Sequence, residues 1–346
     1  MNSSERNISF DLLRIISAIG VIVMHVTALC YNTCVFQDTN WYITSVYNSL
    51  FHYGVPIFVM ISGALFLNPN REINIRKLYT RNILRLVCVY LVWSAVYGIY
   101  DFCQYKAGWK FLLWEIVTGR DHLWFLPMII GIYMILPILS AWIKNTDQKV
   151  IQYFLCLFFV FQILCETINE LPVPEILNHI TELRNIELVL SYVGYFVAGY
   201  YIVYVGFSER IRWFLQISGI ILGLLSIPAM LILSNHSGYT NAGLVNSYSI
   251  FTFFYSISLF TFFYSHFTCK EMSEKKTRFI SNLGKDTLGV YAAHIAIIEL
   301  LQNFGYTVTS LPLIVGIPIY VIVVYIIGTL ISAVLRRIPV VGRYIC

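Results

Sequence analysis

Long apolar segments alternate with short polar connections along the whole chain. Each apolar segment has about the 20 residues that an α-helix needs to cross the hydrocarbon core of a bilayer. The connections are too short to hold a soluble domain, so the sequence predicts one all-α, polytopic membrane domain over residues 1–346. We expect about ten transmembrane helices, at approximately 8–31, 46–67, 82–103, 123–142, 150–168, 186–206, 213–234, 246–267, 286–303 and 312–335.

Composition and charge placement support this class and give it an orientation. Hydrophobic residues make up 58% of the chain and charged residues only 12%, against about 25% charged in soluble domains. If the N-terminus is inside, eighteen of the 23 Lys and Arg lie at the cytoplasmic side and four lie outside. Both termini are therefore expected in the cytoplasm. The net charge of +5 follows this pattern and indicates membrane lipid, with no nucleic acid, as the partner.

The first apolar segment, 8–31, holds ionisable residues at a depth that a bilayer normally excludes. A charged side chain there costs on the order of 3 kcal/mol unless it faces a wet cavity or a partner. Arg14 and His25 are eleven residues apart, so they share one face of the helix, about 16 Å apart along its axis. Asp11 precedes Arg14 by one turn and can pair with it. We interpret this stripe as one wall of a reaction channel.

His25 is the candidate for proton transfer within this stripe, because an imidazole titrates near neutral pH. The expected orientation puts His25 towards the exterior and Arg14 towards the cytoplasm. A histidine that only supports helix packing is the alternative interpretation.

Two arginines open the third apolar segment in the stretch TRNILRL. Arg81 and Arg85 are four residues apart, on one face of a regular α-helix at its cytoplasmic end. Their guanidinium groups suit the phosphate oxygens of a lipid head group or of a phosphorylated cofactor. The alternative is an ordinary positive-inside anchor.

Two further histidines are candidates for the same site. His122 begins the fourth segment, on the same expected side as His25, and His294 lies within the ninth segment, one turn from Tyr291. A histidine in interfacial water would also explain His122, and a hydrogen-bonded structural histidine would explain His294.

The cysteines and histidines form no cluster with the spacing of zinc ligands, so we expect no metal site. Cys30 and Cys34 lie near one helix end and would pair only in an oxidising compartment; we expect two free thiols.

Several stretches together resemble membrane acyltransferase family 3. RIISAIGVIVMH reproduces the family's arginine, ten residues and histidine in the first span, and FDLLR, GVPIFVMISG, HLWFLP and LGVYAAH follow in family order. The resemblance runs from residue 10 to about 295 and is closest to the surface-polysaccharide O-acetyltransferases, which lack an attached domain. The family's second arginine pair has two intervening residues, whereas position 82 here is Asn.

This resemblance implies an integral O-acyltransferase of the bacterial cytoplasmic membrane. Its donor would be acetyl-CoA, and its acceptor a hydroxyl of a cell-surface glycan or of its lipid-linked precursor. No permanently bound cofactor is implied. At such a site, His25 would act as the general base, or it would carry the acyl group as a covalent acyl-histidine intermediate.

The remaining candidate residues receive roles on the same basis. Arg14, Arg81 and Arg85 would bind the phosphates of the donor, and Asp11 would hold Arg14. His122 would contact the acceptor or orient the base. Tyr291 and His294 are expected to support the site structurally.

Other functions stay open at this point. A transporter or flippase would use Arg14 and His25 to line a substrate or proton path. The same membrane module also resembles an uptake component that is attached to racemase domains, although no such domain is present here. A non-catalytic subunit of glycan assembly, and a homo-oligomer, are also compatible with the sequence.

Overall fold

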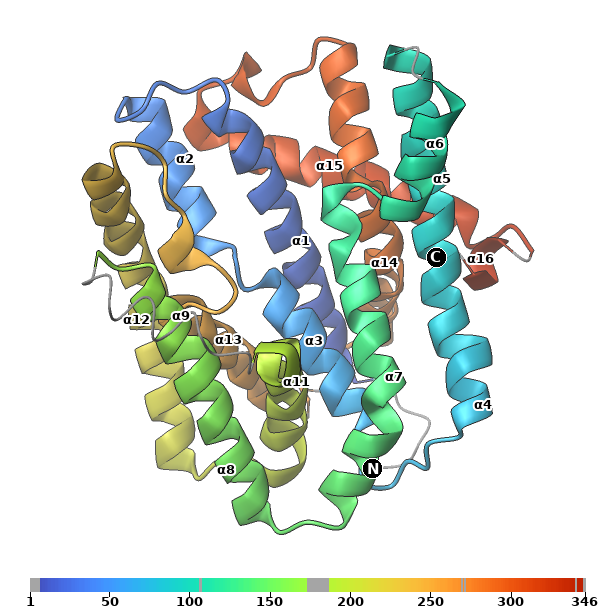
Figure 1. The fold of residues 1–346 in the computed structure, drawn as a ribbon, viewed down its shortest axis with the longest axis vertical. Coiled ribbons are helices and arrows are strands. Elements are labelled where there is room, and N and C mark those ends of the chain that lie inside the picture. Colours follow the sequence, from blue (N-terminus) through green and yellow to red (C-terminus); the bar gives the residue numbers. More distant parts are fainter. Residues whose placement is uncertain are drawn as a thin grey trace.

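The computed structural model describes residues 7–105, 108–172, 187–268, 270, 272–339 and 341–344. Within these residues the chain is built of helices and connections, with no β-strand. The expected all-α class is therefore confirmed. The described helices cross one another as a bundle, and α1 (Ile8–Tyr31) passes through its middle (Figure 1).

After α1, the described part of the first half of the chain forms eleven further helical elements. They are α2 (Thr39–Leu50), α3 (Gly54–Phe66), α4 (Ile75–Lys77), the π-helix η1 (Leu78–Ile83), α5 (Leu84–Tyr105), α6 (Trp109–Thr118), the 3₁₀ turn η2 (Asp121–Trp124), α7 (Phe125–Lys144), α8 (Gln148–Phe158), the π-helix η3 (Phe159–Leu164) and α9 (Cys165–Asn169).

The second half completes the bundle. Its elements are α11 (Glu187–Tyr200), the π-helix η4 (Tyr201–Val205), α12 (Glu209–Ser237), the 3₁₀ turn η5 (Gly243–Val245), α13 (Ile250–Phe267), α14 (Glu274–Asn303), the 3₁₀ turn η6 (Val308–Ser310), α15 (Leu313–Leu335) and α16 (Val341–Tyr344).

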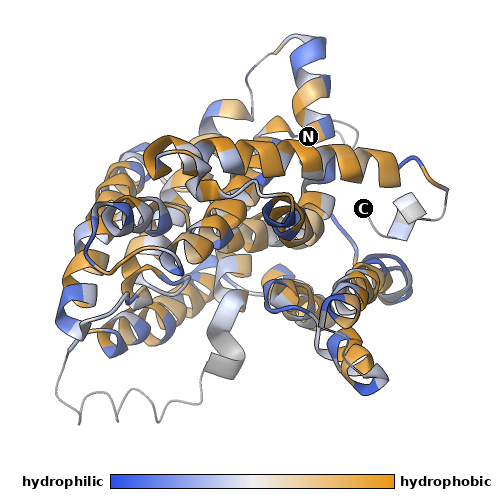
Figure 2. Cartoon of the chain, turned by 90° about the horizontal axis from the view of Figure 1, so that it is seen from above, coloured by the Kyte–Doolittle hydropathy of each residue, from blue (hydrophilic) through white to orange (hydrophobic). Residues whose placement is uncertain are grey.

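Eight helical segments of the described chain are long and apolar enough to cross a membrane. Apolar residues cover most of the helix surfaces when the bundle is seen from above (Figure 2). The protein is therefore a multi-pass membrane protein. The eight segments are Ile8–Tyr31, Thr39–Phe66, Ile75–Gln104, Trp109–Lys144, Gln148–Asn169, Glu209–Ser237, Gly243–Phe267 and Leu313–Leu335.

Two of the ten expected spans are not among these eight. Within the expected span 186–206, residues 187–205 form α11 and η4, and residue 186 lies outside the described residues. The expected span 286–303 lies on the second part of α14. Asp286, His294 and Glu299 lower the mean hydropathy of α14, although its face towards α1 is buried.

Side chains next to the helix ends explain several of the boundaries. Asn7 caps α1 by accepting a hydrogen bond from the backbone N–H of Ser9, and Asp38 caps α2 through the N–H of Trp41. Ser249 caps α13 in the same way through Thr252.

The second expected span, 46–67, differs from the structure. The helix begins earlier, at Thr39, and is interrupted between Leu50 and Gly54. A Cβ atom on Gly54 would lie 2.8 Å from the carbonyl oxygen of Ser17, so α3 begins in direct contact with the backbone of α1. The interruption is stabilised by Asn48, whose amide donates to Thr27 of α1 and whose oxygen contacts His52.

Close helix contacts hold α3 against α11. A Cβ atom on Gly63 would lie 1.8 Å from the carbonyl oxygen of Phe196, and one on Gly199 would lie 2.0 Å from that of Met60. Only glycine fits at these two positions, as is common where transmembrane helices pack closely.

Candidate active site

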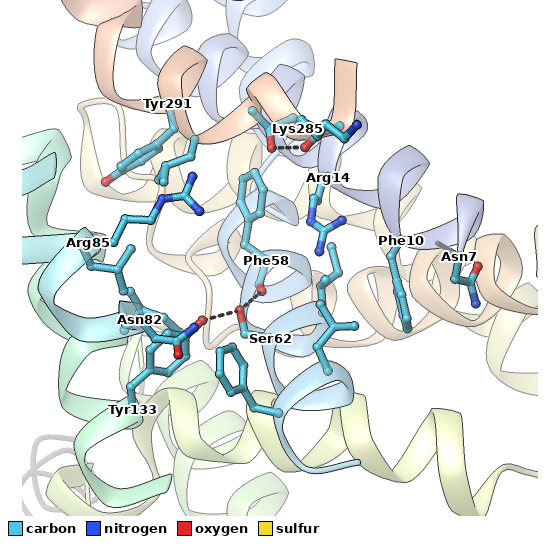
Figure 3. A pocket seen from close by; sticks show the side chains of 18 of the residues that line it. Asn7, Phe10, Arg14, Phe58, Ser62, Asn82, Arg85, Tyr133, Lys285 and Tyr291 are labelled. Carbon is cyan, nitrogen blue, oxygen red and sulfur yellow. Dashed lines mark hydrogen bonds between the residues drawn. The ribbon is translucent and has the colours of Figure 1, made fainter. Parts of the chain in front are cut away.

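A cavity of about 1180 Å³ opens beside the first half of α1 (Figure 3). Side chains from α1, α3, η1, α5, α7 and α14 line it, together with residues of the connection after α3. Its lining includes no Asp or Glu among the residues that the structure describes. The cavity therefore suits a ligand with several negative charges. The five cationic residues in its lining are Arg14, Arg71, Arg85, Lys285 and Arg336.

Arg14 is held in the cavity wall by a buried carboxylate. Its Nη1 lies 2.8 Å from Oδ1 of Asp11, and Asp11 is fully buried. Ser281 of α14 donates a second hydrogen bond to Asp11 at 2.9 Å. Gly284 lets α14 approach here, since a Cβ atom on it would lie 2.7 Å from Oδ1 of Asp11. Asp11 thus fixes Arg14 between α1 and α14.

The two arginines expected at the start of the third segment have different positions. Arg85 lines the cavity, whereas Arg81 is exposed and is not part of the lining. The chain around Arg81 forms the π-helix η1, in which hydrogen bonds join residues five apart. The wider turn changes which side chains share a face, and Asn82 lines the cavity instead of Arg81 (Figure 3).

Arg71 is a cationic residue of the cavity that the sequence reasoning did not single out. Its guanidinium lies 4.4 Å from the centre of the Phe66 ring and donates to the carbonyl oxygen of Leu65 at 3.1 Å. Burial lowers the pKa of Arg71, because desolvation disfavours the cation. No helical periodicity connects Arg71 with the others, since it lies in the connection between α3 and α4.

Three histidines from distant parts of the chain meet beyond the inner end of the cavity. The ring centre of His25 on α1 lies 4.9 Å from that of His294 on α14 and 6.1 Å from that of His122 in η2. The rings of His122 and His294 are 5.2 Å apart. We call these residues the histidine cluster. His25 is partly buried, His122 is 5% exposed and His294 is fully buried.

Hydrogen bonds orient the His294 ring and anchor the backbone of His122 in the histidine cluster. Nδ1 of His294 lies 2.6 Å from the carbonyl oxygen of Tyr291. That carbonyl can only accept, so Nδ1 carries the proton and Nε2 presents a lone pair. The hydroxyl of Tyr291 donates to the carbonyl oxygen of His122. Nε2 of His122 and Nε2 of His294 have no hydrogen-bond partner in the described protein, so both are available to a polar group that enters.

Tyr291 connects the cavity to the histidine cluster. It lines the cavity together with Phe125, and their ring centres are 5.5 Å apart. The same tyrosine ring lies 6.1 Å from the His294 ring and 6.4 Å from the His122 ring. His25 itself is not part of the lining. The arrangement is therefore a cationic cavity, and Tyr291 in its wall packs against the histidine cluster.

The structure thus brings together most of the residues selected from the sequence. His25, His122, Tyr291 and His294 form one contact group, Arg14 and Arg85 line the cavity, and Asp11 pairs with Arg14. Arg81 lies outside both groups. Among the described residues, no His, Cys, Asp or Glu group has the arrangement of a metal site. Cys30 and Cys34 are free thiols in the structure.

Comparisons with known proteins give one match. A family model described as an acyltransferase domain matches residues 7–337, which is nearly the whole chain. No curated protein and no solved structure matches.

Proposed function

The chain belongs to membrane acyltransferase family 3, and from this premise we propose that it is an O-acetyltransferase of the bacterial cytoplasmic membrane. It would transfer the acetyl group of cytoplasmic acetyl-CoA to a hydroxyl of a cell-surface glycan or of its lipid-linked precursor. The main support is one arrangement: a cavity with five cationic residues is lined by Tyr291, whose ring contacts His122 and His294, and these two rings contact His25.

The cationic end of the cavity suits the phosphates of acetyl-CoA. Arg14 and Arg85 would bind them with their guanidinium forks, with Asn82 as a neutral hydrogen-bonding neighbour. Arg71 adds a further cation, whose position is fixed by Phe66. The expected contact of Arg81 has less support, because its side chain is exposed outside the cavity.

The reach from the phosphates to the histidine cluster also fits this donor. Arg14 and His25 are eleven residues apart on one straight helix, which is about 16 Å along its axis. An extended pantetheine arm spans such a distance. The thioester would then lie near Tyr291, and the histidine cluster would face its carbonyl carbon.

In the proposed reaction His25 takes the proton of the acceptor hydroxyl. The oxygen attacks the thioester carbonyl, a C–O bond forms and the C–S bond breaks. The proton then passes from His25 to the departing thiolate of CoA. Nε2 of His294, which presents a lone pair, would accept a hydrogen bond from His25 and leave the other nitrogen of His25 as the base. An acyl-His25 intermediate is the second mechanistic option.

Radiolabelled acetyl-CoA tests this proposal. The purified protein in lipid nanodiscs is incubated with the label and a crude glycan-lipid fraction, beside His25→Ala, Arg14→Ala and the control Arg212→Gln. Arg212 forms an exposed pair with Glu209 at one end of α12. We expect label on glycan for the wild type and the control only. Wild-type protein that leaves acetyl-CoA intact in nanodiscs, but moves glycan substrate across the membrane of sealed proteoliposomes, would instead indicate a transporter.

A further inference from the structure

A network of ion pairs lies on the other side of the histidine cluster from the cavity wall. Arg120, just before η2, binds Asp101 of α5 through two bonds, Nε to Oδ2 at 3.0 Å and Nη2 to Oδ1 at 2.5 Å. Its Nη1 binds Oε1 of Glu299 on α14 at 2.8 Å. The side chain of Asp101 is only 7% exposed, and those of Arg120 and Glu299 about a quarter. All three donor nitrogens of the guanidinium therefore have defined partners.

Tyr97 lies between this network and the histidine cluster. The guanidinium carbon of Arg120 is 5.5 Å from the centre of the Tyr97 ring. The same ring meets the His122 ring edge to face at 4.9 Å. The hydroxyl of Tyr97 donates to the carbonyl oxygen of Ala292 at 2.8 Å and accepts from the N–H of Ala296 at 3.1 Å. These bonds anchor the side chain of Tyr97, which belongs to α5, to the backbone of α14. Its ring contacts both Arg120 and His122.

The backbone that carries His122 needs such anchors. It is a single 3₁₀ turn, Asp121–Trp124, that follows Gly119 with a φ of +68°. A Cβ atom on Gly119 would also lie 2.9 Å from the hydroxyl of Tyr90, so this position favours glycine. One short turn has few hydrogen bonds of its own. The position of His122 therefore depends on side chains around it.

We propose that Arg120 is a positioning residue: through Asp101, Glu299 and the ring of Tyr97, it holds His122 in the histidine cluster. This inference rests on the proposed acetyl transfer, because it gives His122 a reason to be held. Arg120 would not touch donor or acceptor itself. Its effect would be on the rate of the chemical step and not on donor binding, since the cationic cavity is lined by other residues.

A purely structural ion-pair network is the competing explanation, and the choice of variants separates the two. Arg120→Lys keeps the positive charge, but an ammonium group cannot donate the paired hydrogen bonds that Asp101 accepts from the guanidinium. Phe at position 97 keeps the ring between Arg120 and His122 but loses both bonds to α14. Leu at position 97 removes the ring. Arg212→Gln, which breaks the exposed pair with Glu209, is the matched control.

The test measures three quantities for Arg120→Gln, Arg120→Lys, Tyr97→Leu, Tyr97→Phe and the control in nanodiscs. They are the unfolding temperature, kcat and KM for acetyl-CoA, and the rate at which diethyl pyrocarbonate modifies His122, followed peptide by peptide by mass spectrometry. We expect kcat to fall about tenfold to a hundredfold in Arg120→Gln and Tyr97→Leu, at nearly unchanged KM, because misplacement of about 1 Å has such effects.

His122 should be modified faster in these two variants at a similar unfolding temperature. For Tyr97→Phe and Arg120→Lys, kcat and the rate of His122 modification should lie between those of these two variants and those of the wild type. An unchanged rate of His122 modification, with kcat falling only as folded protein is lost, would overturn the inference. The modification rate does not require turnover. A wild type without acetyl transfer would therefore contradict the proposed function, while the modification data would still report on the position of His122.

Discussion

Nδ1 of His294 and the carbonyl oxygen of Tyr291 are 2.6 Å apart, one helical turn from each other on α14. This contact assigns the proton to Nδ1 and leaves a lone pair on Nε2, in a ring that contacts the other two imidazoles of the histidine cluster. His294 was expected to be structural, and its geometry suits a more direct role beside His25.

Replacing His294 tests that role. His294→Gln should lower kcat by about a hundredfold or more, in the range of lost proton-transfer catalysis, with little change in KM for acetyl-CoA. The matched control is His236→Gln, because His236 is an exposed histidine near the end of α12. Steady-state kinetics in nanodiscs would check this. Equal kinetics of the two variants would return His294 to a structural role.

The π-helix η1 predicts different effects for two neighbouring arginines. Arg85→Gln should raise KM for acetyl-CoA about tenfold, as expected for the loss of one charge-assisted hydrogen bond. Arg81→Gln should change KM little, because Arg81 is exposed outside the cavity. Each variant serves as the control of the other. A larger effect at Arg81 would show that the regular α-helical register describes the donor site better.

Asp11 should matter for both stability and donor binding. Asp11→Asn removes the carboxylate beside Arg14 and weakens the hydrogen bond that Ser281 donates to the side chain at position 11. We expect this to lower the free energy of unfolding by about 1–3 kcal/mol. KM for acetyl-CoA should rise because Arg14 is no longer held. Chemical unfolding in detergent and initial rates would measure the two effects. Stability and KM equal to those of the wild type would contradict a role of Asp11 in fixing Arg14.

Close packing of α3 on α11 gives a prediction that is independent of function. Gly63→Ala should destabilise the protein by about 1–3 kcal/mol, because its Cβ atom would overlap the backbone at Phe196. Gly131 on α7 is the control, since a Cβ atom there would have no neighbour within 4 Å. Gly131→Ala should be neutral or slightly stabilising. Thermal unfolding in detergent distinguishes the two variants. Similar losses of stability in both would mean that α3 and α11 pack less tightly than the structure indicates.

The sequence was sufficient for the class of protein and for most of the candidate residues, because these depend on local patterns. Apolar length identified the membrane helices, and the eleven-residue spacing put Arg14 and His25 on one face of α1. His122 and His294 were selected because they lie at or within apolar segments, and Tyr291 because it is one turn from His294. Their meeting in one cluster depends on packing between α1, α14 and η2.

What the sequence did not reveal depends on departures from regular helices and on contacts between distant residues. The π-helix at Arg81 and the interruption before Gly54 do not appear in a hydrophobic pattern that assumes 3.6 residues per turn. In the sequence, Arg120 was only one of the four basic residues expected on the outer side of the membrane. Its partner Glu299 is 179 positions away, so no local signal connects the two.

The most direct test of the central claim separates binding from chemistry in one sample. Wild-type protein and His25→Ala are each saturated with radiolabelled acetyl-CoA in nanodiscs, and bound label is measured before a glycan-lipid fraction is added for a single turnover. The cationic cavity predicts equal binding, and the histidine cluster predicts label on glycan for the wild type alone. Transfer by His25→Ala at the wild-type rate would contradict the account.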